Sequence, residues 1–328
     1  MLKDKVRTDA YRDFIYDHKH LFAGKVVLDV GCGTGILSMF CAKAGASLVI
    51  AVDNSDIIDK ARENVYNNNF SDKITCLRGK IEEVILPVKK VDVIVSEWMG
   101  YCLLYEAMLE SVIWARDIYL KSDGLMVPSH INMWIAPFSD LDYIADHTAF
   151  WSDVYGFDMK AMQTGIYEEV QILNIPSSSL CAEPFPFLQL SLHSVTVDSL
   201  VFKKEWRGTV SKDIDALDGF VIWFDVFFMP SRNNNVPENA KAEQWTKHGR
   251  GGVAFTTGPH GEETHWKQGI LLVDHKIRDF GHKKGENLGG HVEYAVAKDN
   301  SRALNLSIFW TFGPEMTSPP ASRKWTMN

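Results

Sequence analysis

The sequence predicts an α/β protein in two parts, a parallel sheet with helical crossovers followed by an antiparallel, barrel-like β domain. Over residues 1–128, short apolar runs alternate with helical patterns. Over residues 129–328, strand patterns follow one another, mostly without helices between them. Alternating strands and helices are typical of parallel sheets with right-handed crossovers, whereas consecutive strands are typical of barrels and sandwiches.

The first part contains four runs that we expect to be strands, and the first two are short, β-branched runs of the kind that is buried on both faces. These strands cover residues 25–30, 48–53, 74–77 and 91–96. Helical patterns cover residues 36–44, 56–68 and 103–120, and residues 124–128 close this part.

Six strand patterns occupy the second part, over residues 188–197, 219–229, 252–256, 269–273, 291–297 and 303–311. Residues 151–186 mix helix and loop, and residues 231–250 are polar and rich in asparagine. We expect the second of these segments to be a mobile surface loop, because long connections without secondary structure lie on the surface.

Composition and charge exclude several classes of protein. The chain is 46% hydrophobic and 23% charged, as in ordinary globular proteins. A formal net charge of -8 without a stripe of Lys and Arg argues against direct nucleic-acid binding and favours cationic partners. No apolar run approaches the roughly 20 residues that cross a bilayer, and the N-terminus lacks the apolar core of a secretory signal. We therefore expect no membrane contact.

The cysteines are scattered, without the paired spacing of a zinc site. They are Cys32, Cys41, Cys76, Cys102 and Cys181. Unpaired thiols are typical of intracellular proteins. We expect no metal and a cytoplasmic location, with the nucleus left open as a second compartment.

A glycine loop follows the first strand. Gly31, Gly33 and Gly35 lie where the strand gives way to a helix, so the chain can turn tightly and a nucleotide can approach the backbone closely. The dinucleotide fingerprint requires its third glycine at position 36, where this chain has Ile36. The shorter motif suits a cofactor without a pyrophosphate, notably S-adenosylmethionine. Asp53 ends the second strand, where it is placed to accept both ribose hydroxyls. An ordinary glycine turn and a nicotinamide oxidoreductase remain open at this point.

Two glutamates follow the fourth strand. Glu97 comes directly after it, at the carboxyl edge where doubly wound sheets bind ligands. Glu106 lies one loop further on, and a turn at Gly100 would fold it back toward Glu97. Two close carboxylates repel each other unless a cation joins them, and a guanidinium offers five donors to such a pair. The alternative is that these glutamates are solvated near the start of a helix.

These motifs resemble the protein arginine methyltransferases, and the resemblance covers most of the chain. The matching segments, in order, are residues 3–12 (KDKVRTDAYR), 27–37 (VLDVGCGTGIL), 80–83 (KIEE), 96–106 (SEWMGYCLLYE) and 264–268 (THWKQ). The resemblance implies a Rossmann-like methyltransferase domain over 1–128. It also implies a β-barrel-like substrate-binding domain over 129–328, with a helical dimerisation arm at about 155–186.

The resemblance also implies roles for individual residues. Asp53 would hold the ribose, Glu82 the adenine amino group and Arg7 the methionine carboxylate. The full cofactor set would be Arg7, Asp29, Gly31, Gly33, Gly35, Asp53, Ile81, Glu82 and Met108.

For catalysis, the resemblance implies that Glu97 and Glu106 clamp the substrate guanidinium, while His265 pairs with Asp4 nearby. Without the resemblance, a single histidine in a β domain is usually structural.

The implied reaction moves methyl groups from S-adenosylmethionine to arginine side chains of arginine/glycine-rich proteins, leaving S-adenosylhomocysteine. Monomethylarginine and asymmetric dimethylarginine are the expected products of this type I branch. The family also implies a homodimer. Apolar residues suited to the arm interface are Trp151, Tyr155, Phe157, Met159 and Met162.

Two other functions remain open from the sequence. One is a small-molecule methyltransferase or another nucleotide-cofactor enzyme. The other is a weak or inactive scaffold that binds arginine-rich proteins. Family chains usually carry an aromatic helix before the segment that corresponds to Met1, so we expect either that this sequence is part of a longer chain or that its cofactor lid is incomplete.

Overall fold

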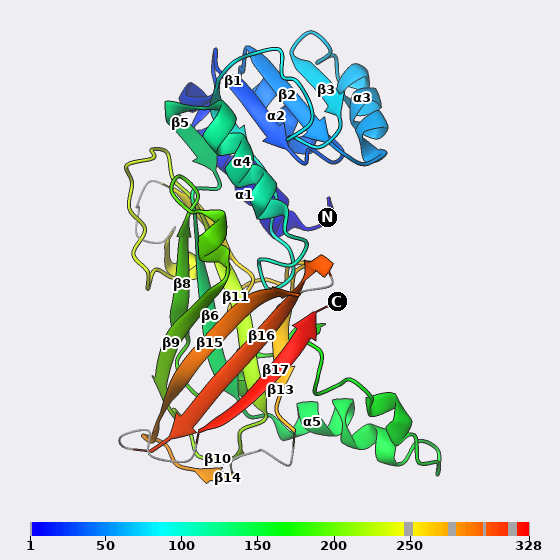
Figure 1. Ribbon diagram of the computed structural model, residues 1–328, viewed down its shortest axis with the longest axis vertical. Helices are drawn as coiled ribbons and strands as arrows, with labels where there is room; N and C mark the ends of the chain where they lie inside the picture. Colours follow the sequence, from blue (N-terminus) through cyan, green and yellow to red (C-terminus); the bar gives the residue numbers. More distant parts are fainter. Residues whose placement is uncertain (1, 246–251, 275–279, 298–299, 314–319, 328) are drawn as a thin grey trace.

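The computed structural model describes residues 2–245, 252–274, 280–297, 300–313 and 320–327 (Figure 1). A parallel-sheet domain, blue to teal, lies at one end of an elongated molecule. The β-barrel, green to red, lies below it, and a green helical arm projects sideways from the barrel.

Five parallel strands form the first sheet, in the order β3-β2-β1-β4-β5. They are β1 (Val26–Val30), β2 (Leu48–Asp53), β3 (Ile74–Arg78), β4 (Val91–Val95) and β5 (Leu120–Val127). The associated helices are α1 (Lys5–Asp17), α2 (Ile36–Lys43), α3 (Ile57–Asn67) and α4 (Met108–Tyr119). Strand order reverses between β1 and β4, and ligands of doubly wound sheets bind at that reversal. The α/β prediction is confirmed.

Helix α1 was not identified from sequence. It packs against α2 of the first domain and against β12 (Val253–Thr256) of the barrel. Asp4 caps its N-terminus by accepting a hydrogen bond from the Arg7 backbone N–H at 3.0 Å. One face of the helix is buried, and it carries Arg7, Ala10, Tyr11, Phe14 and Ile15. This face directs Arg7 and Tyr11 toward the end of β4, where Tyr11 donates a hydrogen bond to the Ser96 carbonyl at 2.8 Å.

Two antiparallel sheets form the barrel. The larger contains β6 (His130–Phe138), β7 (Gln171–Leu173), β8 (Phe185–Ser191), β11 (Gly219–Phe228), β12 (Val253–Thr256) and β13 (Gln268–Leu272). The other contains β9 (Phe202–Thr209), β15 (Asn287–Ala297), β16 (Asn300–Phe312) and β17 (Ala321–Met327). A short pair, β10 (Ile214–Ala216) and β14 (Phe280–His282), completes the set. Strand β8 lies beside β9, and a bridge between Glu169 and Thr326 joins the sheets at the other edge.

Several element boundaries differ from the prediction. The strand expected over 188–197 runs from Phe185 to Ser191, and the helix expected from residue 103 begins at Met108. The barrel strands that were not predicted are β6, β7, β9, β10, β14 and β17. All nine residues of β6 are buried, so it lacks the alternation that marks a half-exposed strand.

The asparagine-rich segment does not form a mobile loop over its described residues. Val236 and Trp245 are buried, and residues 242–245 form the short helix α6 (Ala242–Trp245). The Asn132 side chain of β6 donates to the carbonyls of Pro237, Glu238 and Ala240 at 3.0–3.1 Å. These hydrogen bonds thus attach the segment to the barrel. Residues 246–250 lie outside the described residues.

The arm leaves the barrel after β6. It contains α5 (Leu141–His147) and two short 3-10 turns, Ala149–Ser152 and Lys160–Gln163. It thus begins earlier than residue 155, and the chain has rejoined the barrel at β7 well before residue 186. Tyr155 and Phe157 are 98% and 70% exposed, so the arm presents apolar surface. No helix among the described residues is long and apolar enough to cross a membrane.

Candidate active site

A cavity of about 220 Å³ lies at the carboxyl ends of the first three strands. Val30, Gly31, Val52, Asp53, Asn54, Gly79, Lys80, Ile81, Glu82, Met108 and Ser111 line it. Five residues of the predicted cofactor set are therefore in the wall of one cavity: Gly31, Asp53, Ile81, Glu82 and Met108.

The glycine loop closes tightly on this cavity. Gly31 adopts φ +73°, and a Cβ atom added there would lie 2.1 Å from the Cε of Met108, so a side chain at this position would displace the methionine. The Gly33 N–H donates to Asp53 Oδ2 at 2.8 Å, and Ser55 donates to Oδ1 through its N–H and hydroxyl. Asp53 thus holds the loop as well as facing the cavity.

Asp29 does not line the cavity. It is fully buried beneath the loop, where the Ser38 hydroxyl donates to its Oδ2 at 2.5 Å. Burial raises the Asp29 pKa to about 7. Gly35 also lies outside the lining and caps α2 with φ +83°. These two residues support the loop from below.

Glu97 and Arg7 form a buried ion pair close to the cavity. Arg7 Nη1 lies 2.8 Å from Glu97 Oε2, and both side chains are less than a tenth exposed. Burial raises the Glu97 pKa even though Arg7 lowers it. Glu97 Oε1 has no hydrogen-bond partner in the described part of the chain. In this structure Arg7 therefore occupies one oxygen of Glu97, and it is not among the cavity-lining residues.

His265 reaches Asp4 from the barrel. Its Nδ1 lies 2.6 Å from Asp4 Oδ2, and its backbone N–H donates to the same oxygen at 2.9 Å. These bonds and that of the Arg7 N–H hold the pKa of Asp4 at about 2, against burial, which acts to raise it. The pairing predicted for His265 and Asp4 is present, and it joins α1 to the barrel loop that carries Trp266.

Glu106 lies in a different environment from Glu97. Its side chain is 50% exposed, and its Oε1 lies 3.6 Å from Nη2 of Arg302 on β16. Its backbone has φ +81°, which is rare for a residue with a side chain. The structure thus places the two glutamates on one loop but pairs each with a different arginine of the chain.

Contacts with the barrel fix the loop that bears both glutamates. Trp266 Nε1 donates to the Met99 carbonyl at 2.8 Å, and the Glu106 N–H donates to the Arg302 carbonyl at 3.0 Å. Gly100 turns the loop so sharply that an added Cβ would lie 1.8 Å from the Tyr105 carbonyl oxygen. The predicted turn at Gly100 is therefore present.

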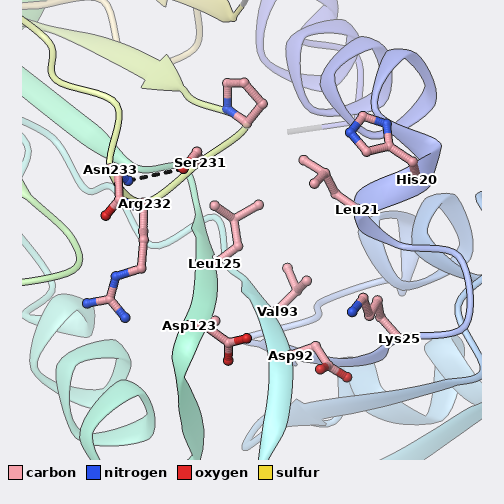
Figure 2. Close-up of a pocket in the computed structure, with 12 residues that line it drawn as sticks. His20, Leu21, Lys25, Asp92, Val93, Asp123, Leu125, Ser231, Arg232 and Asn233 are labelled. Carbon is pink, nitrogen blue, oxygen red and sulfur yellow. Dashed lines mark hydrogen bonds between the residues drawn. The ribbon is translucent and has the colours of Figure 1, made fainter.

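A second cavity, of about 350 Å³, lies away from this chemistry (Figure 2). Asp92 at the start of β4 and Lys25, just before β1, are on one side, and Arg232 of the barrel is on the other. It opens at the amino ends of parallel strands, opposite the edge where such sheets bind their ligands. We therefore assign the active site to the carboxyl edge.

Comparison with known families agrees with this geometry. Residues 130–315, more than half of the chain, match the arginine methyltransferase oligomerization subdomain, and residues 16–126 match ribosomal protein L11 methyltransferase (PrmA). The chain belongs to the protein arginine N-methyltransferase family. The cofactor of these methyltransferases is S-adenosylmethionine.

Individual relatives cover nearly the whole chain. The ribosomal protein arginine N-methyltransferase rmt3 of Schizosaccharomyces pombe is 44% identical over 94% of this chain, which spans 55% of that relative's length. Protein arginine N-methyltransferase 1 of the same organism is 42% identical over 96% of this chain and 86% of its own. A solved structure, the Trypanosoma brucei PRMT1 enzyme-prozyme heterotetrameric complex with AdoHcy, matches with a TM-score of 0.86. It is 33% identical and covers 100% of this chain and 96% of its own.

Several residues of the site were not identified from sequence, among them Gly79, Ser111 and Arg302. Gly79 follows β3 at the carboxyl edge, and the rule that pointed to Asp53 applies to it equally. Ser111 lies three residues after Met108, on the same face of α4. Arg302 is 196 positions from Glu106, so no local signal connects them.

Proposed function

We propose that this protein is a type I protein arginine N-methyltransferase. It transfers methyl groups from S-adenosylmethionine to guanidino nitrogens of arginine/glycine-rich proteins and forms monomethylarginine and then asymmetric dimethylarginine. The observation that carries the proposal is the buried carboxylate of Glu97. One of its oxygens already binds a guanidinium, that of Arg7, and the other has no partner among the described residues.

The cavity residues suit S-adenosylmethionine. Asp53 and Glu82 offer carboxylates for the ribose and the adenine amino group, while Ile81 and Met108 offer apolar walls. Arg7, beside Glu97, offers a cation for the methionine carboxylate. The bound cofactor supplies an electrophilic methyl group on a positively charged sulfur.

The residues around Glu97 orient the nucleophile. Free arginine is protonated and its lone pairs are delocalised. A buried carboxylate holds positive charge on the nitrogens that it binds, which leaves the attacking nitrogen richer in electrons. It also aligns that nitrogen, and such positioning contributes roughly 7–11 kcal/mol in favourable cases. Glu106 would bind the same guanidinium from the other side. The proton released after transfer would leave through His265, which Asp4 holds at 2.6 Å.

We further propose a homodimer in which the arm of one copy packs against the other. The match to an oligomerization subdomain supports association, and the exposed Tyr155 and Phe157 provide apolar surface for it. We place the protein in the cytoplasm, with the nucleus as a second compartment, because its five cysteines are unpaired.

Mass spectrometry of an Arg-Gly-rich peptide, after incubation with the protein and S-adenosylmethionine, tests the activity. The control is the same peptide with every Arg replaced by Lys. We expect gains of one and two methyl masses on arginine only, and fragmentation then assigns asymmetric product. If the peptide and the cofactor bind by calorimetry but no methyl is transferred, the scaffold function is favoured instead.

A further inference from the structure

The beginning of β16 contacts the loop that bears Glu97 and Glu106. The Glu106 N–H donates to the Arg302 carbonyl at 3.0 Å, and the backbone at Glu106 and Ala107 has φ values of +81° and +58°. Residues with side chains hold such values only where tertiary contacts impose them. This backbone contact fixes where the Glu106 side chain begins, whatever side chain is present at position 302.

The two arginine–glutamate pairs of the site differ in strength. Arg7 and Glu97 are buried and 2.8 Å apart, so their pair is shielded from water. Arg302 and Glu106 are 65% and 50% exposed and 3.6 Å apart. Exposed ion pairs contribute about 0–1 kcal/mol, and an aligned guanidinium with two parallel hydrogen bonds binds a carboxylate more strongly. A substrate arginine is therefore able to displace Arg302.

We propose that Arg302 is a positioning residue for Glu106, whose guanidinium holds the carboxylate at the mouth of the site until the arginine of a substrate replaces it. The proposal rests on the proposed function, because it takes Glu106 as a ligand of the substrate guanidinium. Arg302 is not among the residues that line the cavity at the carboxyl ends of β1, β2 and β3. Its partner Asn300 accepts a hydrogen bond from the Arg302 N–H at 3.0 Å and fixes the start of β16.

This arrangement predicts a kinetic signature that damage to the fold would not produce. Without the Arg302 guanidinium, Glu106 samples more orientations before the substrate arrives, so more peptides bind with an arginine that Glu106 does not engage, and this nonproductive binding lowers kcat and KM together. The same change removes a competing cation and leaves the site more negative, so a cationic peptide binds more tightly and KM also falls. A merely structural role would lower kcat and raise KM, with a lower Tm.

The test compares wild type with Arg302→Ala and Arg302→Lys, using an Arg-Gly-rich peptide at saturating S-adenosylmethionine. For Arg302→Ala we expect kcat and KM each to fall about two- to fivefold, the size of an exposed ion pair. Arg302→Lys retains the charge and should recover most of both. Arg207→Ala, an exposed arginine on β9, is the matched control and should leave both constants unchanged.

Calorimetry of peptide binding, with S-adenosylhomocysteine present, gives a second measurement that needs no turnover. Tighter binding by Arg302→Ala supports the proposal, even if wild type transfers no methyl, in which case only the proposed function fails. Equal or weaker binding overturns it. Unchanged kcat and KM in Arg302→Ala, or a raised KM that Lys does not rescue, also overturn it.

Discussion

Three carboxylates of the site lie in three different environments, and burial and hydrogen bonding in each environment affect how readily the carboxylate is protonated. Glu97 is buried and paired with Arg7, Glu106 is half exposed, and Asp4 accepts three hydrogen bonds. Burial raises the pKa of Glu97, while hydrogen bonding lowers that of Asp4. Residue type alone therefore does not determine how each acid behaves.

Replacing Glu97 by Gln tests the clamp. Gln retains the shape and an acceptor oxygen but removes the charge that holds the guanidinium, so we expect kcat to fall on the order of a hundredfold or more. S-adenosylmethionine affinity, measured by calorimetry, should change little. Glu110→Gln, an exposed glutamate of α4, is the control and should retain full activity. A Glu97→Gln variant that folds, binds cofactor and turns over normally would remove Glu97 from the mechanism.

The buried carboxyl of Asp225 on β11 should make the free energy of unfolding depend on pH. It is 3% exposed, Oδ2 accepts the Ala242 N–H at 2.8 Å, and Oδ1 lacks a hydrogen bond within the described ranges. Burial raises its pKa to about 7, although Thr256 and Trp134 nearby lower it. Between its ordinary pKa of 3.8 and this value, the folded protein binds more protons than the unfolded chain. Its contribution to the unfolding free energy therefore decreases as pH rises through that window.

Asp225→Asn should remove this contribution. We expect the variant to gain stability relative to wild type by up to about 4 kcal/mol between pH 4 and pH 8, because Asn retains an acceptor for the Ala242 N–H and has no charge to bury. Urea unfolding at several pH values measures the gain, with the exposed Asp123→Asn as the control. Parallel stability curves for variant and wild type would show that Asp225 does not titrate in this range.

At the scale of elements, α1 and the loop 97–107 come together at the site because hydrogen bonds from barrel residues fix the position of each. Asp4 caps α1 and also binds His265, while Trp266 binds the Met99 carbonyl. The barrel therefore shapes the active site. This explains why residues 103–107, whose pattern favours helix, form a loop with φ values that a helix excludes.

Asp4→Asn tests the link between α1 and the barrel. Asn caps helices as well as Asp does, so the variant keeps the cap and loses the charged pairing with His265. The pKa of Asp4 is lowered to about 2, so its stabilisation is present above pH 4 and is lost as pH falls toward 2. We expect Asp4→Asn to cost about 2 kcal/mol of unfolding free energy at pH 7 and almost nothing near pH 2.

Asp140→Asn is the matched control, because Asp140 caps α5 on the arm by accepting from the Tyr143 N–H and its other carboxylate oxygen accepts from the Ser179 hydroxyl. Chemical unfolding at pH 7 and pH 3 compares the two variants. A loss in Asp4→Asn that is the same at both pH values would mean that the charged pair with His265 contributes nothing.

At the scale of the whole molecule, the arm extends away from the barrel (Figure 1). Leu141, Phe150, Tyr155, Phe157 and Met162 are each more than half exposed. Exposed apolar surface of this kind marks an interface. The arm is therefore the surface on which we expect two copies to associate.

A double variant, Tyr155→Glu with Phe157→Glu, tests the interface. Two charges in an apolar contact are costly to desolvate, so we expect light scattering to give the mass of a dimer for wild type and of a monomer for the variant. Val201→Glu, at an apolar position outside the arm that is also more than half exposed, should remain dimeric. A wild-type chain that runs as a monomer at all concentrations would contradict the arm as a dimer contact.

The sequence by itself determined the features that depend on short stretches of chain. Buried strands, the glycine loop and the acid that ends β2 are local patterns, and the structure brings Gly31 and Asp53 to one cavity. Ile81, Glu82 and Met108, which line the same cavity, came from the family resemblance. The His265–Asp4 pair came from resemblance to a family, since no local pattern relates residues 261 positions apart.

Tertiary structure alone decided how the charged groups are paired. That Glu97 binds Arg7, that Glu106 meets Arg302, and that Asp29 supports the loop from beneath all depend on which segments pack together. The β6 strand and the anchored segment after residue 231 were misread because their burial comes from neighbours distant in sequence. Hydrogen bonds and ion pairs act over a few ångströms, so they are fixed only when the fold brings distant segments into contact.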